Sequence, residues 1–300
     1  MTARETTLLR GKPVADGVYA KLEPRIAALA DRGVVPGLAA ILVGENPASQ
    51  VYVRSKSKAF ARLGLMAETF ALPSDTSASD LGALIDRLNG DDRFHGLLVQ
   101  LPLPAHLAAD RLLDRVTPDK DVDGFHPYNL GLLMAGRPAL IPCTPQGILE
   151  LLQHYKIKTA GRHAVVAGRS MIVGKPLAAL LSLKRPTGNA TVTLCHTGTE
   201  NLSAFTRQAD LLIVATGVPG LISPDMVKPG VDIIDVGMNR VEDDSEKGYH
   251  LEGDVITGDM LGRANSITPV PGGVGLMTVA MLVSNTVLAA EISAGVAAGR

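Results

Sequence analysis

Short apolar runs alternate along this chain with longer segments in which apolar residues recur every three or four positions. This alternation of strand and helix patterns is typical of the α/β class. In the first half we expect strands at 38–45, 66–72 and 96–104, and helices at 13–32, 48–64, 77–90 and 105–115. In the second half we expect strands at 163–168, 191–196, 210–216 and 231–237. These later runs are apolar throughout, which predicts a parallel sheet buried on both faces.

Polar signals between these segments indicate two domains. Thr144 can cap a helix that Pro145 opens, and we place the domain boundary near residue 145. The charged segment 241–250 is expected to be a solvated hairpin or loop. The last apolar segment is interrupted by polar residues, so we expect a packed helix rather than a membrane anchor. These polar residues are Ser284, Asn285 and Thr286.

Composition narrows the functional class. The 300 residues carry 29 basic and 30 acidic side chains, so no strong field favours nucleic acid or a membrane surface. The two cysteines form no CxxC pair, and the seven histidines show no metal-binding spacing. The amino-terminal segment lacks the apolar core of a signal peptide. We therefore expect a cytoplasmic protein that binds small molecules, without a metal ion and without nucleic-acid or membrane partners.

The segment VYVRSKSKAF at 51–60 places one lysine on the apolar face of a helix. On a helical wheel, Lys56 falls near the middle of an apolar arc, where an unpaired ammonium is costly to bury. The arc is formed by Tyr52, Val53, Ala59, Phe60 and Leu63, and the opposite side carries Arg54, Lys58 and Arg62. Lys56 therefore either packs its stem and extends its charge to water, or lines a cleft as a reactive amine.

The segment VVAGRSMIVGKP at 165–176 predicts a phosphate-binding turn between a strand and a helix. Gly168 allows a tight turn, Gly174 lets a ligand approach the backbone, and the helix starting at Pro176 offers N–H groups to a diphosphate. The turn is not a GxGxxG motif, because Ser170 replaces the second glycine. A P-loop is excluded because Pro176 replaces the Ser/Thr that binds magnesium. We expect a dinucleotide site.

The residues around this turn favour NADP over NAD. Enzymes that use NAD usually place an acid at the end of the second strand, but here that strand ends in His196 and Thr197. Arg169 directly follows the first glycine and suits a 2′-phosphate. Segments 215–217, which contains Gly217, and 235–239 end later strands and should line the same crevice.

Three further segments carry signals with two interpretations each. Gln100 ends an apolar strand, either as a strand-end hydrogen-bonding group or as part of a site. The spacing of three aspartates resembles the start of a calcium loop, but Leu130 stands where that loop needs a bidentate acid, so calcium is excluded. A Pro/Gly loop precedes the last helix, either as a flexible connector or as a close backbone approach to a ligand. The residues concerned are Asp119, Asp121, Asp123, Gly272, Gly273 and Gly275.

The chain resembles the bifunctional methylenetetrahydrofolate dehydrogenase/methenyltetrahydrofolate cyclohydrolase family from about residue 8 to 290. The resemblance is carried, in order, by VGENPASQVYVRSKSKAFARLGL, NGDDRFHGLLVQLPLP, DKDVDGFHPYN, PCTPQG, GRSMIVGKP and TPVPGGVGLMT. Leu276 departs from the family, which usually has proline there. The resemblance implies an N-terminal α/β folate-binding catalytic domain, 1–145 completed by a C-terminal helix at 275–300. It also implies a Rossmann-like parallel-sheet NADP domain at 146–274, a cleft between the domains, and a homodimer.

The resemblance also assigns residues to roles. It implies that Lys56 is the catalytic lysine, that Gln100 hydrogen-bonds it, and that Asp123 holds the pterin ring. Tyr52 matches the tyrosine that orients the folate, and Pro271, Gly272 and Gly273 match the loop bordering it. The implied cofactor contacts are Gly168, Arg169, Ser170, Thr197 and Met238, to which we add Thr144, Gly174 and Gly217 as candidates.

The implied activity is NADP-dependent oxidation of 5,10-methylenetetrahydrofolate, followed by hydrolysis of the methenyl product to 10-formyltetrahydrofolate. Such a product belongs to one-carbon metabolism and serves purine biosynthesis. Two other classes remain open from the residues. One is an NADP-dependent dehydrogenase of small hydroxy or amino acids, which would use Lys56 and Asp123 on a carbonyl. The other is a dinucleotide-sensing protein without catalysis, in which leucine could replace Lys56.

Overall fold

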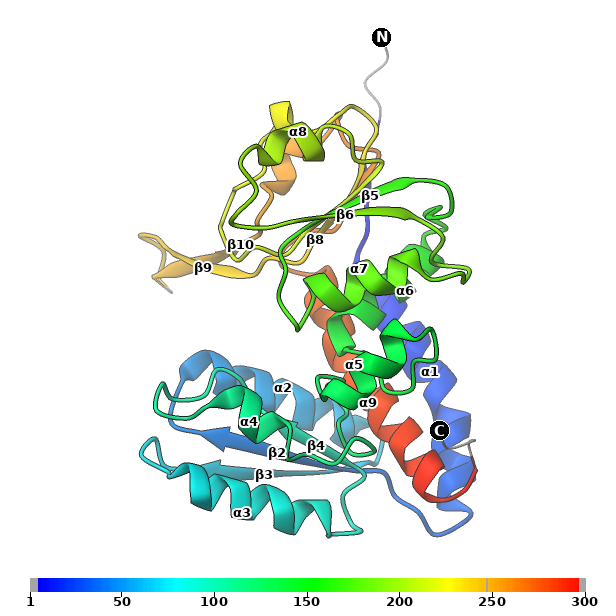
Figure 1. Ribbon diagram of the computed structural model, residues 1–300, viewed down its shortest axis with the longest axis vertical. Helices are drawn as coiled ribbons and strands as arrows, with labels where there is room; N and C mark the ends of the chain where they lie inside the picture. The colour runs from blue at the N-terminus through cyan, green and yellow to red at the C-terminus, as the bar shows by residue number, and fades with distance from the viewer. Residues whose placement is uncertain (1–4, 247, 297–300) are drawn as a thin grey trace. The chain divides into compact units, whose positions relative to one another are not determined.

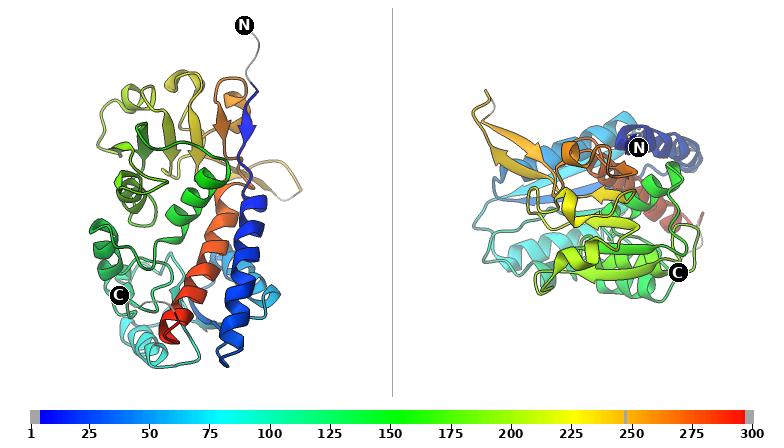
Figure 2. Two further views of the ribbon diagram at one scale, coloured as in Figure 1. Left: turned by 90° about the vertical axis from the view of Figure 1, so that its right-hand side faces the viewer. Right: turned by 90° about the horizontal axis from the view of Figure 1, so that it is seen from above.

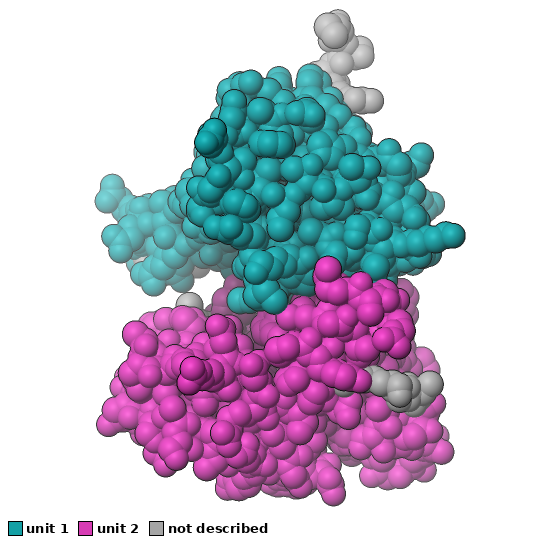
Figure 3. Space-filling model, in the orientation of Figure 1, with its two compact units in different colours: residues 1–16, 144–278 teal, residues 17–143, 279–300 magenta. Residues whose placement is uncertain are grey.

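The computed structural model describes residues 5–246 and 248–296, which form two compact units (Figure 1, Figure 3). Unit 1 comprises residues 5–16 and Thr144–Thr278, and unit 2 comprises Gly17–Cys143 and residues 279–296. The chain passes from one unit to the other within helix α1 (Gly11–Ala30), at the start of α6 (Cys143–His154) and within α9 (Val274–Ser293). The functional domains predicted at 1–145 with 275–300 and at 146–274 stay a prediction, and their residues 1–4 and 297–300 lie outside the described part.

Unit 2 is built on a parallel sheet with the strand order β3 (Met66–Leu72), β2 (Gly37–Val43) and β4 (Gly96–Val99). Every residue of the central strand β2 is buried, whereas the edge strand β3 is partly exposed. Helices α2 (Pro47–Arg62) and α3 (Ala78–Asn89) cover opposite faces of this sheet (Figure 1). Because side chains alternate along a strand, one set of β2 and β4 residues packs on α3. That core includes Ala39, Ile41, Val43, Leu81, Ile85, Leu88, Phe94, Leu97 and Val99.

The other helices of unit 2 are α4 (Ala109–Leu113), α5 (Pro127–Met134) and the later halves of α1 and α9. The two long helices run side by side (Figure 2), and Arg25 pairs with Glu291 at 2.6 Å. Helix α9 is long and apolar enough to cross a membrane, but 67% of its most apolar window is buried inside the protein. The expected packed helix is confirmed to Ser293, while its last predicted residues, 297–300, lie outside the described part.

Unit 1 contains a second parallel sheet that follows the Rossmann pattern. Its strand order is β1 (Thr7–Leu8), β11 (Ser266–Ile267), β8 (Asp232–Asp235), β7 (Leu211–Val214), β5 (His163–Ala167) and β6 (Thr191–Cys195). The chain moves from β5 outward to β6 and then returns to β7 on the other side of β5. The strand order therefore reverses between β5 and β7, and ligands of such sheets bind at the carboxyl ends of the strands at this point.

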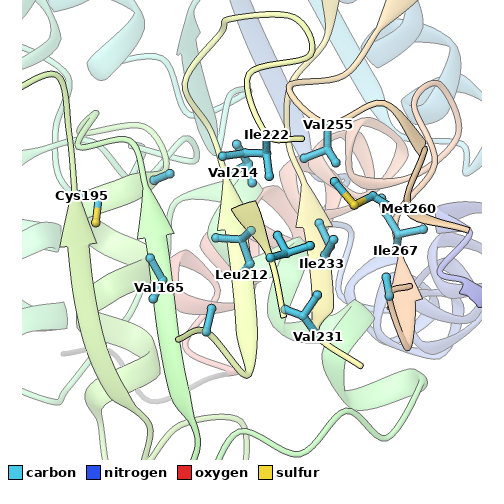
Figure 4. Packing of buried hydrophobic residues seen from close by; sticks show 14 residues of the cluster. Val165, Cys195, Leu212, Val214, Ile222, Val231, Ile233, Val255, Met260 and Ile267 are labelled. Atoms are coloured by element: carbon cyan, nitrogen blue, oxygen red, sulfur yellow. The ribbon is translucent and has the colours of Figure 1, made fainter. Parts of the chain in front are cut away.

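The core of unit 1 is formed by apolar side chains on these strands and the segments beside them (Figure 4). The remaining elements are α7 (Gly174–Ser182), α8 (Leu202–Thr206), the 3-10 helices η1 (Pro224–Met226) and η2 (Thr257–Met260), and the antiparallel hairpin of β9 (Asn239–Glu242) and β10 (Tyr249–Glu252). The predicted α/β class and the parallel sheet predicted for the second half are confirmed. The segment 241–250, expected to be a hairpin or loop, is a hairpin.

Several sequence predictions were wrong in detail. The strand expected at 96–104 ends at Val99, because prolines at 102 and 104 cannot donate to a ladder. Thr144 is not a helix cap, because α6 already begins at Cys143. The helix expected at 105–115 is confined to Ala109–Leu113. The two residues of β1 pair with β11, a contact too short to leave a pattern in the sequence.

Candidate active site

Helix α2 places Lys56 on its inner face. Asn46 caps the helix by accepting a hydrogen bond from the Ser49 N–H at 3.1 Å, and Pro47 occupies the first turn. Lys56 is only 7% exposed, whereas Arg54 and Lys58 are exposed, as the helical wheel predicted. A buried lysine on a helix needs a polar partner within the protein or a ligand.

Gln100 supplies that partner. It follows strand β4, and its backbone N–H continues the ladder by donating to the Ile41 carbonyl at 2.9 Å. The Lys56 Nζ donates to the Gln100 Oε1 at 3.0 Å, and the Gln100 Nε2 donates to the Leu101 carbonyl at 2.8 Å. The second bond fixes the amide so that its oxygen faces the amine. The lysine is therefore held by a neutral acceptor rather than by a carboxylate.

Asp123 lies in the loop after β4, at a position that penalises its charge. Burial raises the pKa of Asp123 to about 6; the charge of Lys56 opposes this rise and that of Asp121 adds to it. Among the described residues, no hydrogen bond to the Asp123 carboxylate is present. A carboxylate that is costly to ionise and has no internal donor is suited to accept N–H groups of a ligand.

The Asp123 loop is fixed from both sides. Asp121 accepts hydrogen bonds from the backbone of Phe125 and His126 and from Asn129 Nδ2, at 2.8–3.1 Å. On the other side, Asn285 Nδ2 in α9 donates to the carbonyl oxygens of Val122 at 2.8 Å and Ile141 at 2.9 Å. The Cys143 thiol also donates to Val122.

A glycine is needed at the next position of this loop. Gly124 has φ +76°, and a Cβ there would lie 2.5 Å from the nitrogen of Pro142. The position of Asp123 is thus set by backbone that Asn285, Cys143 and Gly124 hold in place.

Tyr52 precedes Lys56 by one helical turn, but the sequence prediction for its burial was wrong. The residue is 37% exposed rather than part of the core, although it falls on the apolar arc of the helical wheel. Partial burial raises the pKa of Tyr52. Tyr52, Lys56, Gln100 and Asp123 all belong to unit 2.

The turn after β5 packs tightly against the protein's own backbone at both of its glycines. Gly168 has φ +119°, and a Cβ there would lie 2.1 Å from the Ala215 carbonyl oxygen. A Cβ on Gly174 would lie 1.9 Å from the Gly168 oxygen. Ser170 Oγ accepts from the Val173 N–H at 3.1 Å, which closes the turn ahead of α7. Bare backbone at a helix N-terminus and an exposed Arg169 fit the phosphates of NADP.

The end of β6 has no acid to hold a ribose hydroxyl. The His196 N–H donates to Thr199 Oγ1 at 2.9 Å, and His196 Nδ1 accepts from the Gly198 N–H at 3.1 Å. Thr197, at the tip of this turn, is exposed. Neutral and cationic groups at this end of the sheet fit a 2′-phosphate better than a 2′-hydroxyl.

The loops after β7, β8 and β11 complete the candidate site of unit 1. Gly217 follows β7 with φ +71°, and Met238, after β8, is 40% exposed. Met238 shares a small pocket with residues 269–275, which include Pro271, Gly272 and Gly273. The Gly272 oxygen accepts from the Gly11 N–H at 2.8 Å, which anchors this loop to α1.

Thr144 lies beside these loops in α6, within the same unit. Its hydroxyl pairs with that of Thr278 at 3.0 Å, where α9 continues from the Pro/Gly loop. Leu276, the departure from the family pattern, is 45% exposed in the first turn of α9. The structure therefore gathers the four catalytic candidates in unit 2 and the remaining candidates in unit 1. The predicted cleft between the domains stays a prediction, as do the roles of all these residues.

Sequence reasoning missed three buried polar residues near these loops. Asp235 and Asp254 are fully buried and Asn285 is 1% exposed. Asp235 ends an apolar strand and Asp254 follows the charged hairpin, so their positions gave a weak signal. Asn285 was taken for a helix interruption, although a buried amide inside an apolar helix signals an interior hydrogen-bond partner.

Comparison with known proteins bears on both units. Residues 9–123 match the catalytic domain of tetrahydrofolate dehydrogenase/cyclohydrolase, and residues 142–294 match its NAD(P)-binding domain. The chain is 53% identical over 285 residues to the bifunctional protein FolD 1 of Myxococcus xanthus, covering 94% of this chain and 97% of that protein.

Solved structures give the same result. The bifunctional FolD enzyme of Campylobacter jejuni is 46% identical, with a TM-score of 0.90 over 96% of this chain and 99% of that one. The Trypanosoma brucei methylenetetrahydrofolate dehydrogenase-cyclohydrolase, solved with NADP and an inhibitor, is 37% identical, with a TM-score of 0.91 over 97% and 99%. The resemblance drawn from the sequence motifs is confirmed. This chain belongs to the tetrahydrofolate dehydrogenase/cyclohydrolase family.

Proposed function

We propose that this protein oxidises 5,10-methylenetetrahydrofolate to the methenyl form with NADP, and hydrolyses that product to 10-formyltetrahydrofolate. The carrying observation is the buried Lys56, held at 3.0 Å by the neutral amide of Gln100, in a chain of this family. A reactive amine and a carboxylate without internal donors are the two groups that the folate chemistry requires.

The first reaction requires orientation rather than a base. The methylene carbon between N5 and N10 loses a hydride, and donation from a nitrogen lone pair leaves a methenyl cation. When bound, NADP accepts this hydride. The protein's own contribution is to hold the reacting carbon in place, with Asp123 accepting N–H groups of the pterin ring and Tyr52 packing against it.

The second reaction requires a base. Water adds to the methenyl carbon and loses a proton, and the bond to N5 breaks as N5 is protonated, which gives the N10-formyl product. In this proposal Lys56 takes the proton of the water and returns one to N5. Gln100, which accepts the hydrogen bond of the Lys56 amine, is itself uncharged.

The choice of NADP rests on the loops of unit 1. Arg169 is exposed beside the glycine turn, and the segment after β6 offers His196 and Thr197 instead of an acid. Both features favour a 2′-phosphate. The expected result is a lower KM for NADP than for NAD in the oxidation reaction, and equal or better turnover with NAD would contradict it.

A single spectrophotometric assay tests the function. With methylenetetrahydrofolate and NADP, we expect the methenyl chromophore to form and then decay. The Lys56→Met variant should lose the decay while keeping its fold, measured by circular dichroism. Lys58→Met, an exposed position on the same helix, is the matched control and should retain both activities. Hydrolysis of the chromophore at the normal rate by Lys56→Met would refute the assigned role.

We also infer a cytoplasmic homodimer whose product serves purine biosynthesis. Both cysteines are unpaired, which suits a reducing compartment. The family resemblance supports the dimer. The near balance of charge, with 29 basic and 30 acidic residues, supports small-molecule partners rather than nucleic acid or membrane. Sedimentation of the purified protein tests the dimer, and a monomer at micromolar concentration would contradict it.

A further inference from the structure

Asp254 connects two loops that carry candidate NADP contacts. Its carboxylate is fully buried at the carboxyl ends of β7 and β8. Oδ2 accepts hydrogen bonds from the Thr216 N–H at 2.6 Å, the Thr216 hydroxyl at 2.9 Å and the Gly217 N–H at 3.0 Å. Oδ1 accepts from Asn239 Nδ2 at 2.9 Å. Four donors from two separate loops therefore converge on one side chain.

The backbone packs so closely around the Asp254 carboxylate that neither can move without a clash. A Cβ on Gly237 would lie 2.2 Å from Asp254 Oδ1, so the backbone between β8 and Met238 rests directly on the carboxylate. Gly217, in the turn on the other side, has φ +71°. Glycine adopts this left-handed conformation without strain, and Asp254 holds the turn by accepting the N–H groups of Thr216 and Gly217.

Asp235 holds Asp254 in turn. Its Oδ1 accepts from the Asp254 N–H at 3.1 Å and the Gly237 N–H at 2.9 Å, and its Oδ2 accepts from the Val255 N–H at 3.0 Å. The backbone of Asp235 is bonded to Thr268 Oγ1, which starts the Pro/Gly loop. The two carboxylates thus link the loops after β7, β8, β10 and β11.

Keeping two acids at this place is costly. Burial raises the pKa of Asp235 to about 7, against the effect of its backbone hydrogen bonds. Among the described residues, neither carboxylate forms an ion pair with a lysine or arginine. An apolar residue would be cheaper if packing were the only requirement, because each buried acid must be satisfied by backbone donors.

We propose that Asp254 is a positioning residue that holds the Gly217 turn and the Met238 segment in the conformation that binds NADP. The proposal rests on the proposed function and adds a residue to it. Asp254 acts through the loops and does not itself contact the reacting atoms. Its loss should therefore weaken the NADP-dependent reaction and spare the hydrolysis, whose predicted catalytic residues lie in unit 2.

Asp232 provides a matched control at the opposite end of strand β8. It is 3% exposed, and its carboxylate accepts from Asn265, Ser266 and Arg162 at 2.6–2.7 Å. Its replacement removes a buried, hydrogen-bonded acid from the same sheet but leaves the loops after β7 and β8 intact. Loss of general stability and loss of loop position can therefore be separated.

The experiment measures three quantities in the full-length protein: the KM for NADP, the kcat of the oxidation, and the rate of methenyl hydrolysis without NADP. Asp254→Ala should raise the KM for NADP by about tenfold or more, with hydrolysis within about twofold of wild type. Asp254→Asn should give a smaller rise of about threefold, because its amide oxygen still accepts from the Thr216 and Gly217 donors. Asp232→Asn should leave the KM for NADP unchanged.

The outcomes separate a failure of the proposed function from a failure of the positioning role of Asp254. A wild-type protein without NADP-dependent methenyl formation refutes the proposed function itself. An active wild type with an unchanged KM in Asp254→Asn overturns the positioning role, as does an equal rise in Asp232→Asn. If Asp254→Ala does not fold, the comparison of Asp254→Asn with Asp232→Asn decides the question. A parallel fall of hydrolysis and oxidation in the Asp254 variants also counts against the proposal.

Discussion

Replacing Asp123 by asparagine should stabilise the protein while removing both activities. The pKa of Asp123 rises from 3.8 to about 6 in the folded protein, mainly because of burial. Each pKa unit corresponds to about 1.4 kcal/mol, so ionised Asp123 costs the folded state up to about 3 kcal/mol. Asparagine has nearly the same shape and carries no charge, so it escapes this cost.

The sign of the effect fixes its pH dependence. Because the folded-state pKa lies above the unfolded value of 3.8, the folded state binds the proton more tightly, and stability falls as the pH rises toward about 6. Below about pH 3 Asp123 is largely protonated in both states, and the variant gains almost nothing. Above about pH 7 the full difference of about 3 kcal/mol is expected.

Urea denaturation at about pH 3 and about pH 8 measures this difference directly. Asp75→Asn, at an exposed loop aspartate of the same unit, is the control and should change stability at neither pH. The activity assay should show loss of both reactions, because the variant lacks the carboxylate that we propose accepts the pterin N–H groups. Equal stability of wild type and Asp123→Asn at about pH 8, or the same gain at both pH values, would refute the reasoning.

Three further predictions test neighbouring parts of the site. Gln100→Glu replaces the neutral oxygen that lies 3.0 Å from Lys56 Nζ by a negatively charged one. This variant should slow the decay of the methenyl chromophore by about tenfold. An unchanged decay rate would contradict the need for a neutral acceptor. Asn285→Leu removes the amide that donates to the carbonyl oxygens of Val122 and Ile141. The free energy of unfolding measured with urea should fall by about 2–4 kcal/mol. Ser284→Ala is the neutral control, and an equal loss of stability in both variants would count against this prediction. Arg169→Ala should raise the KM for NADP by about tenfold and leave the KM for NAD unchanged. A parallel rise for both cofactors would show that Arg169 does not bind the 2′-phosphate.

Much of the fold could be predicted because its strands are apolar runs. Strand β3 falls at Met66–Leu72 as predicted, and β5 and β8 differ from their predicted bounds by one or two residues. Short elements were missed for a physical reason. Helix α5 has eight residues and begins after two turns capped by Asp121 and His126, and β1 has two residues that pair with a strand more than 250 positions away. Neither element is long enough to show a recognisable periodic pattern of apolar residues.

The candidate site could be predicted where a residue type departs from the hydrophobic pattern of its own segment. Lys56 interrupts an apolar arc, and glycines 168 and 174 interrupt a strand-to-helix transition, so both signals are visible within one segment. The hydrogen bond between Lys56 and Gln100 joins residues 44 positions apart and came only from the family resemblance. Asp254 and Asn285 could not be found because their hydrogen-bond partners lie far away along the chain and are largely backbone groups, which leave no trace in side-chain identity.

Asn285 also sets the order in which this protein can become active during its synthesis. The amide of Asn285 that donates to the Val122 carbonyl lies 163 residues later in the chain. The whole segment Thr144–Thr278 is therefore synthesised before this hydrogen bond can form. Contacts across such a separation close late, because the intervening chain loses entropy when its ends meet. A nascent or truncated chain that lacks α9 therefore contains every predicted catalytic side chain, but the loop that presents Asp123 lacks the two hydrogen bonds that Asn285 donates to Val122 and Ile141. The folate side is thus a property of the completed polypeptide.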